Sequence, residues 1–254
     1  MTEHGVRDKV VVITGSGQGL GRGMALHLGR NGASVVVAEW KPERLGATVA
    51  ELEELGVPTL GVPTNVMEKD SIDAMIATAV ERFGRVDGLI NNAQTFRPNA
   101  SMADVSGDDF DTFYVSGVKG TLWAMQAAYP HMKAQGWGRI VNFASSMGMM
   151  GYQGFGAYNA SKEAIRAISR TAAKEWGADG IVVNVICPGG GPRAQAAVAR
   201  GDEVAMEFSK SKPIPRVGDA EDDIAPVALF LCSDACRWVT GQIFMVDGGG
   251  YLFA

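Results

Sequence analysis

Short apolar runs alternate with longer amphipathic stretches along the whole chain. The short runs are apolar on both faces, which is typical of strands buried inside a parallel sheet. We expect strands at Val10–Thr14, Ser34–Ala38, Thr59–Pro63, Gly88–Asn91, Gly138–Asn142, Ile181–Ile186 and Gln242–Val246. The helical period predicts helices at Gly21–Asn31, Glu43–Leu55, Lys69–Phe83, Phe110–Gln135, Ala157–Ala178 and Ala220–Ser233. This alternation predicts one α/β domain over residues 1–254, a doubly wound parallel sheet with helices on both faces.

The segment from Pro188 to Val217 interrupts the alternation. It is rich in glycine, proline and charged residues, and only Ala194–Ser209 has a short helical pattern. A long connection inside a compact domain is usually functional, and this one leaves the edge of the sheet where ligands bind in α/β folds. We therefore expect residues 188–217 to form a mobile lid over a substrate. A surface insertion without a role in binding is the alternative.

Composition narrows the function classes. The 254 residues include 33 glycines without a collagen repeat, which suggests loops whose backbone conformation matters. A net charge of −5 argues against nucleic-acid binding. Neither the three cysteines nor the three histidines have metal-ligand spacing, so we expect no metal. With no signal-peptide pattern and no apolar run that could span a bilayer, we expect a cytoplasmic protein that does not bind membranes.

A glycine-rich turn follows the first predicted strand directly and leads into a helix. Glycines at such a turn allow the backbone to approach a pyrophosphate, and the helix N-terminus offers N–H groups to it. A strand before the turn and a helix after it form the context of a dinucleotide-binding loop. The candidate cofactor-binding residues of this loop are Gly15, Ser16, Gln18, Gly19, Leu20 and Gly21.

The second predicted strand is followed by an acidic residue, Glu39, eighteen residues after Gly21. A carboxylate at this place can accept hydrogen bonds from the adenosine ribose hydroxyls and would repel the additional phosphate of NADP. Gln18 adds no cation to the loop, whereas Lys41 and Arg44 are nearby cations that count against this reading. We expect NAD as the cofactor, with NADP as the alternative.

Tyr158 and Lys162 open a long predicted helix at positions i and i+4, which places them on one helix face. A free tyrosine has a pKa near 10, and a neighbouring ammonium stabilises its phenolate. Ser145 lies thirteen residues before Tyr158, just after a predicted strand, and its hydroxyl could bond the same substrate oxygen. Spacing alone leaves a surface pair and a turn serine open as the alternative.

Taken together, these motifs resemble the short-chain dehydrogenase/reductase family from about Asp8 to Gly249. Thr14 and the glycine loop match its T-G-x-x-x-G-x-G pattern, and Tyr158 and Lys162 match its catalytic pair. Further landmarks match at Asn91-Asn92-Ala93, Asn184, Pro188-Gly189 and Thr240–Gly249. The resemblance implies a Rossmann-like fold and adds cofactor contacts at Asn65, Val66, Asn92, Ala93, Tyr158, Lys162, Pro188 and Gly189.

The resemblance also implies a mechanism of hydride transfer between NAD(H) and a secondary alcohol or ketone. Tyr158 would be the general acid in reduction and the general base in oxidation, and Lys162 would lower its pKa and hold the nicotinamide ribose. Ser145 would position the substrate oxygen, with Ser146 as the alternative serine. Two other functions stay open: reduction of a 3-oxoacyl thioester, and an attenuated NAD(H)-binding sensor or scaffold.

Four positions depart from the family pattern. Gly117 stands where the family has an asparagine that completes a catalytic tetrad, so either Ser116 or a water would have to fill the gap. Gln94 replaces the glycine after Asn-Asn-Ala, and Arg193 replaces a threonine that contacts the carboxamide. Asn65 replaces a frequent aspartate and keeps an acceptor oxygen. We interpret these changes as an altered proton path in an active enzyme, with simple attenuation as the alternative.

The link between Ser145 and Tyr158 lines the substrate pocket in the family. Met149, Met150, Tyr152 and Phe155 predict an apolar, adaptable wall suited to a cyclic, terpenoid or steroid-like substrate. The methionines could instead pack against the lid or a partner subunit. The candidate substrate-binding residues are Gln94, Met147, Met149, Gln153 and Arg193. The resemblance and the apolar C-terminal tail together imply a homotetramer or homodimer.

Overall fold

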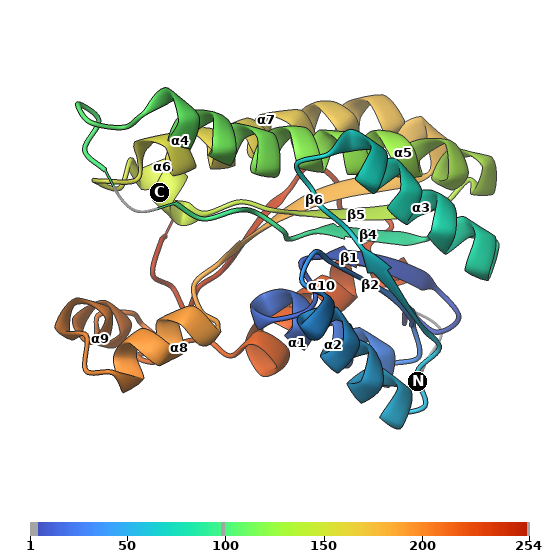
Figure 1. Ribbon diagram of the computed structural model, residues 1–254, viewed down its shortest axis with the longest axis horizontal. Coiled ribbons are helices and arrows are strands. Elements are labelled where there is room, and N and C mark those ends of the chain that lie inside the picture. The colour runs from blue at the N-terminus through green and yellow to red at the C-terminus, as the bar shows by residue number, and fades with distance from the viewer. Residues whose placement is uncertain (1–4, 98–99, 253–254) are drawn as a thin grey trace.

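The computed structural model describes residues 5–97 and 100–252, except for the side chains of residues 192–193, 204–205 and 208. The described strands form one parallel sheet in the order β3-β2-β1-β4-β5-β6-β7 (Figure 1). Their bounds are β1 (Val10–Thr14), β2 (Ser34–Glu39), β3 (Thr59–Pro63), β4 (Gly88–Asn91), β5 (Gly138–Phe143), β6 (Ile181–Pro188) and β7 (Ile243–Val246). The predicted doubly wound parallel sheet is confirmed. The strand order reverses between β1 and β4, and ligands bind at such a switch point in α/β folds.

Helices cover both faces of the sheet. In Figure 1, α3, α5 and α7 lie on one face, and α1, α2 and α10 lie on the other. Alternate residues of β1 serve the two faces, because Val11 and Ile13 pack into one core cluster while Val10 and Val12 pack into the other. The α-helices are α1 (Gly19–Arg30), α2 (Pro42–Glu54), α3 (Lys69–Phe83), α4 (Gly107–Phe113), α5 (Gly120–Gln135), α6 (Ser146–Met150), α7 (Gly156–Trp176), α8 (Pro192–Ala199), α9 (Glu203–Lys210) and α10 (Ala225–Leu231).

The predicted continuous helix Phe110–Gln135 is wrong in one respect. The structure divides it into α4, a π-helical segment at Tyr114–Lys119, and α5. Glycines in this region allow close packing, since a Cβ on Gly120 would lie 2.7 Å from the carbonyl oxygen of Val66. The predicted helix Ala220–Ser233 likewise starts with a π-helical turn, Ala220–Ile224, and its α-helical part is α10.

The predicted lid segment contains two short helices, α8 and α9, rather than one. Gly201 separates the two helices, because its φ of 78° is left-handed and does not occur within an α-helix. The start of the segment is held in place because the Gly191 N–H donates to Gly218 O at 2.8 Å, and Gln195 Nε2 donates to Asp219 Oδ2 at 3.1 Å. In Figure 1 both helices lie to one side of the sheet, away from α4 and α6. Closure over a substrate stays a prediction.

Candidate active site

The turn after β1 is shaped for close approach of an anion. Gly15 and Gly19 have φ values of 66° and 60°, which favour glycine. A Cβ on Gly21 would lie 2.3 Å from the carbonyl oxygen of Gly15, so α1 starts directly against the turn. At the N-terminus of α1, Gln18 gives no side-chain cap and the first turn has no acidic residue. The N–H groups of that turn therefore suit a pyrophosphate.

Ser16 fastens this turn to the neighbouring strands. Its hydroxyl donates to Ile13 O at 2.7 Å and accepts the Ala38 N–H at 3.1 Å. Leu20, at the start of α1, lies against Gly191. A Cβ on Gly191 would be 2.8 Å from Leu20 Cδ2, so the start of the lid segment adjoins the glycine loop. The predicted loop residues are thus brought together at the carboxyl end of β1.

Glu39 ends β2 with its carboxylate beside the glycine loop. The residue is 3% exposed, and its carboxylate accepts the N–H groups of Gly17 at 3.3 Å, Trp40 at 3.0 Å and Lys41 at 3.2 Å. A Cβ on Gly17 would lie 2.6 Å from Glu39 Cγ, so this close approach requires a glycine. A buried acceptor next to a dinucleotide loop fits the hydroxyls of an adenosine ribose.

The loop after β4 is joined to the loop after β1 across the switch point. Thr14 Oγ1 accepts the N–H groups of Asn92 and Ala93, each at 3.1 Å. Asn92 Nδ2 donates to the carbonyl oxygens of Thr14 at 2.9 Å and Gly15 at 3.3 Å. Asn92 and Ala93, two predicted cofactor contacts, therefore lie directly against the start of the glycine loop.

The other predicted cofactor contacts lie at neighbouring strand ends. The side chain of Asn65 builds the turn before α3, because its Nδ2 donates to Glu68 Oε1 at 2.8 Å and its Oδ1 accepts the Met67 N–H at 3.1 Å. Val66 packs against Gly120, as described above. Pro188 ends β6, and the next residue, Gly189, lies so close to β7 that a Cβ there would be 2.3 Å from Asp247 Cβ.

Lys162 is buried within α7 next to the end of β5. It is 5% exposed, and its Nζ donates to Phe143 O at 2.8 Å. The same nitrogen lies 5.5 Å from the centroid of the Tyr158 ring. Burial lowers the pKa of Lys162 to about 8. At neutral pH the side chain is therefore still mostly charged, and its ammonium can stabilise a phenolate at Tyr158.

Ser145 follows the strand whose last carbonyl oxygen accepts the lysine hydrogen bond. It is 7% exposed and caps α6, where its Oγ accepts the Met147 N–H at 3.2 Å. Ser146 is the first residue of α6 instead. The structure therefore places Ser145, rather than Ser146, in the turn between β5 and α6, two residues from the anchor of Lys162.

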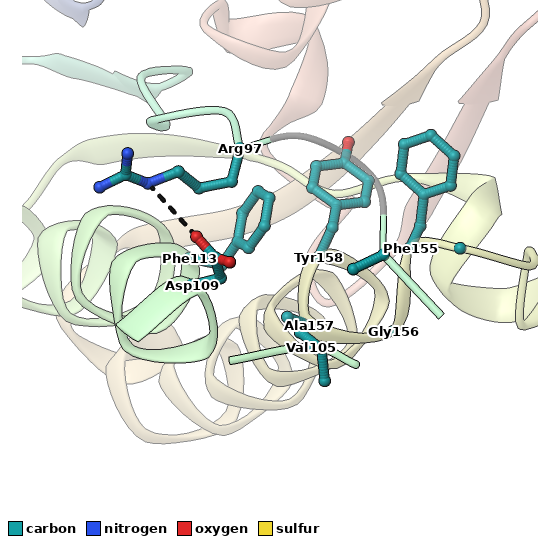
Figure 2. Close-up of a pocket in the computed structure, with 10 residues that line it drawn as sticks. Arg97, Val105, Asp109, Phe113, Phe155, Gly156, Ala157 and Tyr158 are labelled. Atoms are coloured by element: carbon teal, nitrogen blue, oxygen red, sulfur yellow. Dashed lines mark ion pairs between the residues drawn. The ribbon is translucent and has the colours of Figure 1, made fainter. Parts of the chain in front are cut away.

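Aromatic rings surround Tyr158. The ring centroids of Phe113, Phe155 and Phe96 lie 5.8, 6.2 and 6.3 Å from that of Tyr158. Figure 2 shows the Tyr158 ring between those of Phe113 and Phe155. A small pocket adjoins this cluster and is lined by Arg97, Ala100, Val105, Asp109, Phe113, Gly154, Phe155, Gly156, Ala157 and Tyr158. We call Phe96, Phe113, Phe155 and Tyr158 the aromatic cluster.

Sequence reasoning identified Phe155 and Tyr158 and missed the other two members of this cluster. Phe96 follows Asn-Asn-Ala by three residues, and Phe113 ends α4, so neither belongs to a motif. Arg97, next to the cluster, forms an ion pair with Asp109 at 3.7 Å (Figure 2). The position of Phe96, three residues after the Asn-Asn-Ala motif, was the one available signal.

The predicted substrate-binding residues lie in four places. Met147 and Met149 are half-buried in α6, and Gln153 is exposed in the turn before α7. Gln94 is half-buried in the loop after β4 and donates from Nε2 to Ser161 Oγ at 2.9 Å. Arg193 lies in α8, and its side chain is outside the described part of the structure.

The described residues contain neither a metal-binding cluster nor a membrane-spanning helix. No group of three or more His, Cys, Asp or Glu side chains in the described ranges could hold a metal ion. No helix of the described chain is both long enough and apolar enough to cross a membrane. The three cysteines are buried and free, and burial raises the pKa of Cys187 to about 12.

Comparison with known proteins defines the class. A family model described as enoyl-(acyl carrier protein) reductase matches residues 15–250. The chain is 34% identical to a 12alpha-hydroxysteroid dehydrogenase of a Clostridium species, covering 95% of this chain and 96% of that one. It is also 34% identical to a 3-oxoacyl-acyl-carrier-protein reductase of Staphylococcus aureus, covering 96% and 98%.

Solved structures of dehydrogenases and reductases share the fold of this chain. Levodione reductase superposes with a TM-score of 0.90 at 31% identity, covering 96% of this chain and 97% of that one. An NAD+-bound xylitol dehydrogenase gives a TM-score of 0.90 at 31% identity, covering 96% and 99%. The chain belongs to the short-chain dehydrogenase/reductase family. It is accordingly an oxidoreductase with a nicotinamide cofactor, and the glycine loop, the uncapped α1 N-terminus and Glu39 fit such a dinucleotide.

Proposed function

We propose that this protein catalyses hydride transfer between NAD(H) and a hydrophobic secondary alcohol or ketone, with Tyr158 as the general acid and base. The single observation that carries the proposal is the buried Lys162 ammonium, 5.5 Å from the Tyr158 ring and anchored on Phe143 O. A buried cation beside a tyrosine lowers its pKa towards the range in which it can exchange protons at neutral pH.

Each of the three side chains has a distinct part in this mechanism. Tyr158 takes the hydroxyl proton during oxidation and returns it to the carbonyl oxygen during reduction. Lys162 holds the phenolate form of Tyr158 by its charge and orients the cofactor ribose. Ser145 keeps the substrate oxygen within reach of the tyrosine hydroxyl. When bound, the nicotinamide accepts or supplies the hydride, and the protein provides orientation and a matched proton source.

Support for NAD rather than NADP comes from Glu39. Its carboxylate is buried and already accepts three backbone N–H groups, so it is held as an anion acceptor at the ribose position. A phosphate on that ribose would meet this negative charge. An NAD+-bound xylitol dehydrogenase among the structural relatives is consistent with this choice.

A hydrophobic substrate is supported by the aromatic cluster. Its rings flank the tyrosine that would touch the reacting oxygen, so a ring-bearing or otherwise apolar substrate would bury its surface there. The hydroxysteroid dehydrogenase and the levodione reductase among the relatives fit this class. Arg97 beside the pocket and the 3-oxoacyl-acyl-carrier-protein reductase relative make a 3-oxoacyl thioester the second candidate.

One substrate panel separates these candidates. The purified protein is assayed in both directions with cyclic, terpenoid and steroid alcohols or ketones, with short polyols, and with a 3-oxoacyl thioester. The proposal predicts the highest kcat/KM for a bulky apolar substrate with NAD(H). A preference for short polyols would contradict the apolar pocket, and a preference for the thioester would select the second candidate. Cofactor binding without turnover in either direction would indicate the sensor.

The assembly is proposed to be a homotetramer or a homodimer. The exposed rings of Phe110, in α4, and of Tyr114, directly after α4, stack with their centroids 6.4 Å apart, and Leu252 in the C-terminal tail is 74% exposed. Exposed apolar side chains of this kind suit burial between subunits. Sedimentation of the wild-type protein as a monomer alone would refute this assembly.

A further inference from the structure

Two departures from the family pattern, Gln94 and Gly117, meet in space. A Cβ on Gly117 would lie 2.5 Å from Gln94 Nε2 and 3.0 Å from Gln94 Cδ. Gly117 does not have a left-handed φ, so its backbone conformation does not require glycine. The position is restricted by the neighbouring side chain instead, because the carboxamide of Gln94 fills the space that a side chain at residue 117 would need.

Gln94 connects three elements around the tyrosine helix. Its Nε2 donates to Phe113 O at 3.3 Å, at the end of α4, and to Ser161 Oγ at 2.9 Å, in α7. The Ser161 hydroxyl donates in turn to Tyr158 O at 2.7 Å, so it must accept from Gln94. Phe113 O and Ser161 Oγ both accept here, so the carboxamide of Gln94 must point its nitrogen, and not its oxygen, towards them.

The other end of the carboxamide is a buried acceptor. Gln94 Oε1 is shielded from solvent and has no hydrogen-bond partner among the described residues. Buried polar atoms are nearly always hydrogen-bonded, so leaving this oxygen unsatisfied costs stability that the two bonds from Nε2 offset. It belongs to a side chain that is bonded to Ser161, the residue directly before Lys162.

Ser116, the other residue considered for this gap, is already engaged. Its hydroxyl donates to Thr112 O at 2.6 Å and accepts the Thr95 N–H at 3.2 Å. Both bonds hold backbone groups, one in α4 and one in the loop after β4. Gln94, in contrast, reaches the turn of α7 between Tyr158 and Lys162 through its bond to Ser161.

We propose that Gln94 is a positioning residue for proton transfer and that Gly117 is the glycine that admits it. This proposal rests on the proposed role of Tyr158 as the general acid and base. Gln94 holds the start of α7 through Ser161, and this keeps Lys162 at the distance from Tyr158 at which its charge stabilises the phenolate.

Three variants test the proposal from both sides of the contact. Gln94→Leu keeps an apolar side chain of similar size and removes both polar ends. Gly117→Ala keeps Gln94 but forces its carboxamide away. The double variant Gln94→Gly/Gly117→Asn supplies a carboxamide from the opposite side of the same space. Gly46→Ala is the matched control, because Gly46 is an exposed helix glycine and nothing lies within 4 Å of a Cβ there.

We expect Gln94→Leu and Gly117→Ala to lower kcat by similar factors, and the double variant to restore it. Each of the first two variants should lower kcat roughly tenfold to a hundredfold, since small errors in the position of a reacting group have effects of that size. The KM for NAD should stay nearly unchanged, and the rising limb of the pH profile of alcohol oxidation should move to higher pH. The double variant should recover most of kcat and the original limb. An unchanged kcat in Gly117→Ala, a limb that does not move, or a double variant no better than the singles would overturn the proposal.

Thermal unfolding of the same proteins separates this proposal from the proposed function. If the wild type has no turnover with any substrate, the proposed function fails, and the coupling is read from the melting temperatures alone. Gly117→Ala should then lower the melting temperature in the wild-type background but much less in the Gln94→Gly background, where the clash is absent. Equal effects in both backgrounds would refute the contact.

Discussion

Replacement of Glu39 by serine tests how the protein selects its cofactor. Glu39 is 3% exposed at the end of β2, and its carboxylate faces the glycine loop through the Gly17 N–H. Serine removes the negative charge and keeps a short polar group at the same strand end. The change should weaken reaction with NAD and strengthen reaction with NADP, because the two cofactors differ only in the phosphate on the ribose that Glu39 would bind.

The size of each effect follows from the lost contacts. A hydrogen bond to a charged acceptor contributes about 1.5–3 kcal/mol, so we expect kcat/KM for NAD to fall roughly tenfold to a hundredfold. Two like charges about 4 Å apart near a protein surface repel by about 4 kcal/mol. Removing this repulsion should raise kcat/KM for NADP by roughly a hundredfold to a thousandfold, with the smaller value expected where solvent screens the phosphate.

The assay measures kcat/KM for both cofactors with one alcohol at low and high salt. The control is Glu43→Ser, since Glu43 is an exposed glutamate in the first turn of α2. The ratio of NAD to NADP activity should change in Glu39→Ser and hold in the control. If both cofactors changed by the same factor, or if the control shifted the ratio as much, Glu39 would not be the selector.

Two further predictions concern stability and the glycine loop. Burial lowers the pKa of Lys162 from 10.5 to about 8, so between these pH values the unfolded chain binds more protons than the folded one. The free energy of unfolding of the cofactor-free wild type, relative to that of Lys162→Met, should therefore rise by up to about 3 kcal/mol as pH increases through this range. Urea titrations of both proteins at several pH values measure this difference. A difference that does not change with pH would contradict the burial of the lysine. A Cβ in Gly21→Ala would lie 2.3 Å from the backbone oxygen of Gly15, so this variant should lose NADH binding and melt at a lower temperature. Gly46→Ala should keep binding and gain about 0.5–1 kcal/mol, and equal melting of the two variants would show that the loop tolerates a side chain.

The strands and most helices were predictable because their patterns are local. A parallel strand buried on both faces is a continuous apolar run, and β1 and β4 have the predicted bounds, as does the edge strand β3. The π-helical segment Tyr114–Lys119 was not predictable, because the apolar period continues through it. Gly117 in this segment packs against the Gln94 side chain, and Gly120 directly after it packs against the Val66 backbone. Helix type there depends on tertiary contacts that a periodic pattern does not contain.

The candidate site was predictable in its motifs and not in its contacts. The i and i+4 spacing of Tyr158 and Lys162 gives their shared helix face, whereas the bond from Lys162 to Phe143 requires β5 to lie beside α7. Gln94 and Gly117 were each recognisable as departures from the family pattern. Their contact joins positions that are distant in the chain, so only the folded structure shows that the one explains the other.

Tyr158 is proposed to transfer the proton in an NAD-dependent oxidoreduction. The most direct measurement follows NADH formation by the wild type and by Tyr158→Phe across the panel of secondary alcohols, with ketone plus NADH as the reverse assay. We expect turnover by the wild type, and unchanged NADH binding and melting temperature in Tyr158→Phe with kcat lower by roughly a hundredfold to ten-thousandfold. Wild-type rates in Tyr158→Phe, or NADH binding by the wild type without turnover in either direction, would contradict the claim.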